Sequence, residues 1–179
     1  MQLISKLNQI IAKFNLLEHH FYLAWSKGAL TQGNLQRYSA QYYHAAVKNF
    51  PPFVSRVHTH CPHIEARKVL LKNLVEEEIH GTDHPALWMQ FAEGMGITSD
   101  EVLKEKPFAE TEKLVNTFYG LAEQDWRDGL CALYAYESQV PAVSASKIAT
   151  RSRSVFIKCK AVVIPVIPAP IIATSTSKF

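Results

Sequence analysis

Apolar residues recur every three or four positions along most of the chain, which is the spacing of amphipathic α-helices. The first such segment, residues 2–16, carries its large apolar side chains on one face: Leu3, Ile4, Leu7, Ile10, Ile11 and Phe14. A second, shorter segment ends at Gly28, a residue that commonly terminates helices. No stretch alternates apolar and polar residues in the way a half-buried strand does. The pattern therefore predicts an all-α fold.

Capping residues and prolines predict where the later helices begin and end. Thr31 is a candidate N-cap for a long helix. Pro51 and Pro52 should kink or interrupt that helix, because proline lacks the amide donor and clashes with the preceding turn. After a break at Cys61-Pro62, a helix is expected over residues 64–78. Further starts are expected at His84, at the capping box of Thr98, at Glu110, and at Asp125 or Asp128. This predicts a bundle of about seven helices.

The helical periodicity stops near Ile148. Residues 149–160 have no helical period, and residues 161–172 are apolar but contain three prolines. That apolar run is too short and too broken to span a bilayer. We interpret residues 1–148 as one helical domain and residues 149–179 as an aberrant, poorly ordered tail, left by a frameshift or truncation of the gene. A poorly ordered native tail is the alternative interpretation.

Composition and charge narrow the class of protein. A hydrophobic content of 47% and a charged content of 20% are typical of a globular domain. The net charge of +3 is uneven, since no acid follows Glu137 while six lysines and arginines do. A basic tail can bind nucleic acid or a membrane. Because this tail is interpreted as aberrant, we expect neither partner.

The cysteines and the N-terminus bear on the compartment. Cys61, Cys131 and Cys159 lie far apart without a C-x-x-C motif, which favours a reducing compartment. The N-terminal residues lack the continuous apolar stretch of a signal peptide, and no run of 18 apolar residues exists. We therefore expect a cytoplasmic protein.

Residues 72–84 hold a dense group of candidate metal ligands, with four carboxylates and two histidines in thirteen residues. Glu77 and His80 are three positions apart, the spacing that carboxylate-bridged di-metal bundles use to place two ligands on one helix face. A buried glutamate beside a histidine requires a compensating charge, which a divalent metal ion can supply. The alternative is a solvated acidic helix end closed by Gly81.

Several motifs together resemble a known family. They are, in chain order, residues 17–31 (LEHHFYLAWSKGALT), 41–43 (QYY), 64–68 (IEARK), 73–78 (NLVEEE), 84–91 (HPALWMQF) and 135–141 (AYESQVP). In this order and spacing they are similar to the 4-aminobenzoate synthases related to the chlamydial protein associating with death domains. That family belongs to the haem-oxygenase-like group, with the pyrroloquinoline-quinone synthesis oxidase and the thiamin-salvage proteins. The resemblance extends from about residue 5 to Ile148 and implies a haem-oxygenase-like helical bundle.

The resemblance also implies a chemistry and a set of site residues. It implies a non-haem di-iron oxidoreductase that makes 4-aminobenzoate for folate synthesis, in a self-sacrificing reaction that uses molecular oxygen and a reductant. The residues whose roles it implies are Glu77, His84 and Glu137 as metal ligands, Tyr22 as the sacrificed tyrosine, Lys147 as the amino donor and Tyr136 as a tyrosine near the metals. Iron is the implied cofactor, with manganese as the alternative. We expect a homodimer, and the resemblance allows a protein partner, as for the chlamydial relative.

The sequence departs from this family in its last part. The family completes its site with His-x-x-x-Asp-x-x-His on a later helix, whereas this sequence has no histidine after His84 and no aspartate after Asp128. We therefore expect the final helices to be missing, iron binding to be reduced and activity to be impaired, unless His80 or Asp83 replaces a lost ligand.

Two other functions stay open at this point. One is a cofactor-free oxidase or hydrolase of the same fold, and the other is a non-catalytic interaction protein of the death-domain type. Without the resemblance, the polar residues have ordinary structural explanations. Tyr22 would be a core tyrosine with a bonded hydroxyl, and Glu77, His84 and Glu137 would form a satisfied buried polar cluster.

Overall fold

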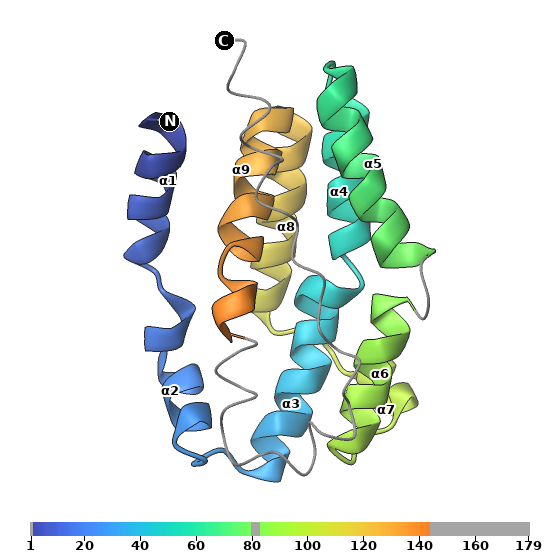
Figure 1. Cartoon of the computed structure of the whole chain (residues 1–179). Coiled ribbons are helices and arrows are strands. Elements are labelled where there is room, and N and C mark those ends of the chain that lie inside the picture. The colour runs from blue at the N-terminus through green and yellow to red at the C-terminus, as the bar shows by residue number, and fades with distance from the viewer. Residues whose placement is uncertain (1, 80–82, 144–179) are drawn as a thin grey trace.

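A computed structural model describes residues 2–79 and 83–143, which form a helical bundle (Figure 1). The labelled α-helices in these two ranges are α1 (Gln2–Ala12), α2 (His20–Ser26), α3 (Gln32–Tyr42), α4 (Phe50–His60), α5 (Ile64–Glu78), α6 (His84–Gly94), α7 (Ser99–Lys104), α8 (Ala109–Gln124) and α9 (Trp126–Glu137), and residues 140–143 are helical too. A short 3₁₀-helix η1 (Leu16–Glu18) precedes α2, and a π-helix η2 (Tyr43–Val47) follows α3. The same ranges contain no strand, so the all-α prediction is confirmed. The proposed domain boundary at residue 148 and the tail beyond it lie outside the described residues.

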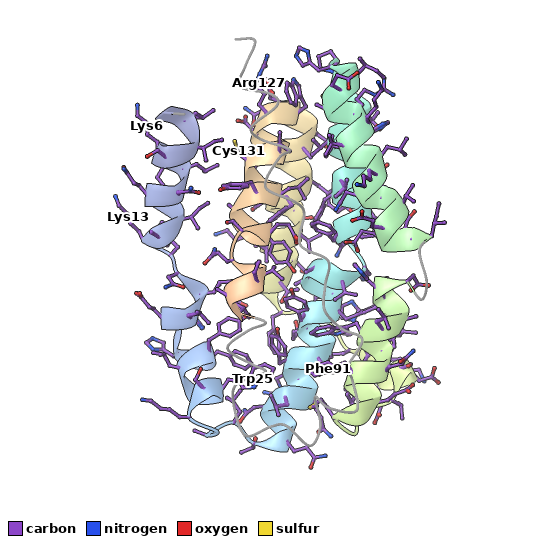
Figure 2. The ribbon with its side chains drawn as sticks, in the orientation of Figure 1. Lys6, Lys13, Trp25, Phe91, Arg127 and Cys131 are labelled. Carbon is purple, nitrogen blue, oxygen red and sulfur yellow. The ribbon has the colours of Figure 1, made fainter. Side chains whose placement is uncertain are left out.

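The helices pack around two apolar regions. In the upper half of Figure 1, α4 packs against α5, α8 and α9, and their buried side chains form one core that includes Val54, Val57, Leu70 and Leu133. In the lower half, α2, α3 and α6 enclose an aromatic cluster that includes Trp25, Trp88 and Phe91. Figure 2 labels Trp25 and Phe91, which lie on either side of α3. The two regions meet at the level of η2.

Side-chain caps set the helix boundaries much as the sequence predicted. Thr31 and Asn34 cap α3 reciprocally, with Asn34 N donating to Thr31 Oγ1 at 3.2 Å and Thr31 N donating to Asn34 Oδ1 at 3.0 Å. Thr98 forms the predicted capping box at the start of α7. Of the two candidate caps for α9, Asp125 is the one used, and it accepts from Arg127 N at 2.7 Å. Gly28 has a φ of +66°, a conformation that favours glycine after a helix.

Pro51 and Pro52 interrupt the long helix, as predicted, by way of η2. The chain leaves α3, makes one π-helical segment and restarts as α4 with both prolines in the first turn. There the missing amides would have no intrahelical acceptor in any case, so the prolines do not weaken α4. Asn49 Nδ2 donates to the carbonyl of His44 at 2.6 Å, which satisfies one backbone group at the irregular junction.

Half of the apolar side chains predicted for the first helical segment, residues 2–16, are exposed, as are parts of α5. Leu3, Ile10 and Phe14 are 64%, 54% and 73% exposed, and α1 reaches α9 through a polar contact in which Tyr134 Oη donates to Asn8 Oδ1 at 2.8 Å. Ile64, Leu71 and Ile79 on and just after α5 are exposed too. Among the helices of the described ranges, none combines the length and the apolar character needed to cross a lipid bilayer.

Candidate functional site

A small cavity lies where the two apolar regions of the bundle meet. Its volume is about 30 Å³, enough for one ion or one water molecule. Residues from α3, η2, α4, α5, α6 and α9 line it: Tyr42, Ala46, Val47, Phe50, Glu77, His84, Leu87, Trp88, Tyr136 and Glu137. The π-helical segment and the proline-led restart of α4 thus bring Ala46, Val47 and Phe50 to the same cavity.

The three residues predicted as metal ligands all line this cavity. Glu77 is in the last turn of α5, His84 opens α6, and Glu137 ends α9. Asp83 caps α6 through Ala86 N at 2.7 Å, and this cap sets the start of the helix that carries His84. His84 Nδ1 is paired with Glu77 Oε2, and the two glutamates are only 4% and 5% exposed. Two separate parts of the sequence, the junction between α5 and α6 and the end of α9, therefore converge here.

Glu77 and Glu137 are both buried at the same cavity, and this arrangement disfavours the charged form of Glu137. Burial, and secondly the negative charge of Glu77, raise the pKa of Glu137 from its ordinary 4.5 to about 8. A bound cation would offset both effects, and carboxylate and imidazole groups are suitable ligands for iron or manganese. The types of residue present thus fit a divalent metal ion.

The three side chains do not form a ready-made ligand cluster. Within residues 2–79 and 83–143, no group of three or more histidines, cysteines, aspartates or glutamates is arranged to hold a metal ion. The physical reason is local, since His84 is turned onto Glu77 and the pair satisfies itself. The assignment of Glu77, His84 and Glu137 as metal ligands therefore stays a prediction.

Two tyrosines form the next part of the cavity wall. The hydroxyls of Tyr42 and Tyr136 are hydrogen-bonded to each other. Burial raises the pKa of both phenols well above the ordinary value, with smaller contributions from neighbouring groups. At neutral pH both therefore remain protonated and can donate or accept a hydrogen bond beside Glu137.

Tyr22, the predicted ring donor, does not line the cavity. It lies on α2, with its ring edge-to-face against Phe21 at 5.4 Å between centroids. Its hydroxyl is hydrogen-bonded with Tyr38, and burial raises the pKa of Tyr22 while this bond lowers it. Tyr38 in turn lies beside Tyr42, with ring centroids 5.4 Å apart. Tyr22 is thus connected to the cavity through the rings of Tyr38 and Tyr42.

The sequence analysis missed the roles of Tyr38 and Tyr42. Both tyrosines fall in the long helix predicted to begin at Thr31, and Tyr42 entered only as part of the QYY motif. Their spacing of four residues was the available signal, because residues at i and i+4 share a helix face. That face carries a line of phenols from Tyr22 towards the cavity.

Of the three further candidate residues, only Asp83 belongs to the described part of the chain. Asp83 is exposed, serves as the cap of α6 and is absent from the cavity wall, so its position does not support the idea that it replaces a lost ligand. His80 and Lys147 lie outside the described residues.

Comparison with known proteins agrees with the resemblance. Residues 4–156 match the TENA/THI-4/PQQC family. A relative from Chlamydia muridarum is 41% identical over 149 residues, covering 83% of this chain and 63% of the relative. Another, from Chlamydia trachomatis, is 40% identical over 149 residues, covering 83% and 64%. A third, from Nitrosomonas europaea, is 38% identical over 154 residues, covering 80% and 62%.

All three relatives are named 4-aminobenzoate synthase. The chain spans slightly less than two thirds of the length of each of them. The family match itself extends over most of this chain, from residue 4 to residue 156. The chain therefore belongs to the TENA/THI-4/PQQC family.

Proposed function

We propose that this chain carries the site of an oxygen-dependent enzyme that makes 4-aminobenzoate from its own Tyr22. The observation that supports this most is the cavity lined by Glu77, His84 and Glu137, with a line of phenols leading from it to Tyr22. The names of the three relatives point to the same product.

In this proposal Glu77, His84 and Glu137 hold iron, or manganese in its place. When bound, such an ion supplies the activation of molecular oxygen, with a reductant as the source of electrons. The chain itself supplies two carboxyl groups to one small cavity, and a bound ion would take the place of the proton that Glu137 holds in the metal-free chain. Three protein ligands are fewer than the four carboxylates and two histidines of a bridged pair, so we expect weak binding of a single ion.

The residues around the cavity exclude water and hold protons. Leu87, Trp88 and Phe50 form its apolar wall, and Trp88 is fixed by its indole N–H, which donates to the carbonyl of Ser39 at 2.8 Å. The protonated hydroxyls of Tyr42 and Tyr136 hold a proton between them, next to Glu137. A dry wall strengthens every charge interaction inside the cavity.

The ring of Tyr22 is held by its neighbours on α2 and α3. Phe21 contacts it edge-on, and the hydroxyl of Tyr38 fixes its oxygen. Conversion to 4-aminobenzoate breaks the Cα–Cβ bond, oxidises Cβ to a carboxyl group and replaces the phenol oxygen, which leaves as water, by an amino group released by cleavage of the donor's C–N bond. Molecular oxygen is the oxidant, and the implied amino donor is Lys147. Fixed positions for the ring and the oxidant account for much of the rate of such a reaction.

Product analysis of the purified chain tests the proposal. The chain is incubated with iron(II) and a reductant under air, and 4-aminobenzoate is measured by mass spectrometry beside the Chlamydia trachomatis relative as a reference. We expect a small yield from this chain, because its ligand set is short, and none from Tyr22→Phe.

The outcomes separate the alternatives. Undiminished product from Tyr22→Phe would exclude Tyr22 as the ring donor. If the reference forms product and this chain forms none at any metal concentration, the proposed activity is wrong for this chain. A product yield that is unaffected by a chelator would favour the metal-free enzyme class instead.

A further inference from the structure

Asn73 is a buried polar residue in an apolar part of α5. The side chain of Asn73 is 5% exposed. Leu70 and Leu74, which lie close to it on the same helix, pack into the upper core. Among the described residues, its Oδ1 atom has no hydrogen-bond partner. A buried acceptor without a donor is destabilising, so its presence calls for a partner that binds there.

The position of Asn73 relative to Glu77 suggests what that partner is. The two residues are four positions apart on α5, so they share one helix face and their Cβ atoms are about 5–6 Å apart. Side chains at i and i+4 can hold one metal ion together, as the two histidines of His-Glu-x-x-His do on a zinc-binding helix. Asn73 is not among the residues that line the cavity, but it lies one helical turn before Glu77 on the same face of α5, where its side chain can share an ion with the Glu77 carboxylate.

The chemistry of the orphaned atom agrees with this arrangement. A carboxamide oxygen is a hard, neutral donor that suits Mn²⁺ or Fe²⁺. It adds a ligand without adding negative charge to a cavity in which two carboxylates already oppose each other. No described group donates a hydrogen bond to Oδ1.

We propose that the Asn73 carboxamide oxygen is a further ligand of the ion held by Glu77. This inference rests on the metal site proposed above and adds a residue to it. Asn73 supplies one of the contacts that a chain with three predicted ligands otherwise lacks. A leucine at this position would fill the same space and fit the surrounding core better, so the polar residue serves binding and not packing.

Calorimetric titration of the full 179-residue chain with Mn²⁺ tests the inference, together with thermal melting in EDTA. The variants are Asn73→Leu, Asn73→Asp and Asn73→Ser. Asn116→Leu is the matched control, because Asn116 is exposed on α8. Asn73→Ser is a second variant without a ligand, because the serine hydroxyl is too short to reach the ion. Serine also changes the core packing differently from leucine, so an effect shared by both variants is not due to packing.

We expect Asn73→Leu and Asn73→Ser to bind Mn²⁺ about tenfold more weakly than the wild type. Asn73→Asp should bind at least as tightly, and Asn116→Leu should bind equally. In EDTA, Asn73→Leu should melt at the same temperature as the wild type or higher, because an unpaired buried group has been removed.

Three results would overturn the inference. Equal affinity of the wild type, Asn73→Leu and Asn73→Ser would overturn it alone and leave the metal site intact. Absence of Mn²⁺ binding by the wild-type chain would overturn the metal site and this inference together. Weaker binding accompanied by a lower melting temperature of both variants in EDTA would assign Asn73 a purely structural role.

Discussion

Glu137 gives the metal-free chain a pH dependence that can be measured. Burial, and secondly the charge of Glu77, raise its pKa from 4.5 to about 8. Between these values the folded chain holds a proton that the unfolded chain has released, so the free energy of unfolding falls as the pH rises. This stabilisation is complete below about pH 4.5 and is lost as the pH passes 8. The slope cannot exceed about 1.4 kcal/mol per pH unit for one proton.

Urea unfolding in EDTA at several pH values from 5 to 8 measures this slope. We expect Glu137→Gln to flatten it, because the amide does not titrate. Glu110→Gln is the control, since Glu110 is exposed at the start of α8. If Glu137→Gln keeps the slope of the wild type, the proton is held elsewhere.

At the scale of single residues, the sequence identified the charged part of the cavity and missed its neutral part. Glu77, His84 and Glu137 are ligand-type residues in apolar helical contexts, a contrast that is visible in the sequence. Tyr38, Tyr42 and Asn73 have no such contrast, because aromatic residues and a single asparagine are common on packed helices. The roles of the two tyrosines depend on their hydrogen bonds, Tyr38 with Tyr22 and Tyr42 with Tyr136. The role of Asn73 depends on its unpaired Oδ1 atom. Only the folded structure contains this information.

At the scale of helices, local chemistry determined the boundaries and packing determined the irregularities. Thr31, Thr98 and Asp125 cap the helices as predicted, because each cap depends on residues within one turn. Pro51 and Pro52 predicted an interruption but not a π-helix. The π-helical segment η2 continues directly from α3 and packs against α6 and α8, and no local pattern encodes these contacts.

The close approach of α9 to α4 and α8 depends on Gly129. A Cβ atom built there would lie 2.7 Å from Val57 Cγ2 and 2.8 Å from the Cα of Ala122. The second of these is a backbone atom, so a helix has to move. We expect Gly129→Ala to lower the free energy of unfolding by about 1–3 kcal/mol, although alanine is the better helix former.

Gly120→Ala provides the matched control, since nothing lies within 4 Å of a Cβ atom at that position in α8. There the gain in helix propensity acts alone and should raise the free energy of unfolding by about 0.5–1 kcal/mol. Chemical denaturation of both variants measures the two opposite signs. A stabilised Gly129→Ala would show that the three helices are packed less closely than described.

At the scale of the whole molecule, periodicity predicted the helical class and one face for each helix, but not what covers that face. The helices of the upper core bury their apolar sides against one another, as their periodicity implies. In α1 and the turn that follows it, the same kind of pattern leaves Leu3, Ile10 and Phe14 more than half exposed. A helix face is a property of a segment, whereas its burial depends on every other segment that reaches it.

The exposed side of α1 leads to a prediction about self-association. Large apolar side chains gathered on one face favour contact with a second molecule. We expect the chain to form dimers or larger species at micromolar concentration in analytical ultracentrifugation. The double variant Ile10→Glu/Phe14→Glu should shift the population towards the monomer without lowering its melting temperature, because both side chains are mostly in solvent. Lys104→Glu changes an exposed charge on α7, which lies away from α1 in Figure 1, and should leave the association unchanged. A monomeric wild type under these conditions would mean that the exposed face of α1 does not drive association.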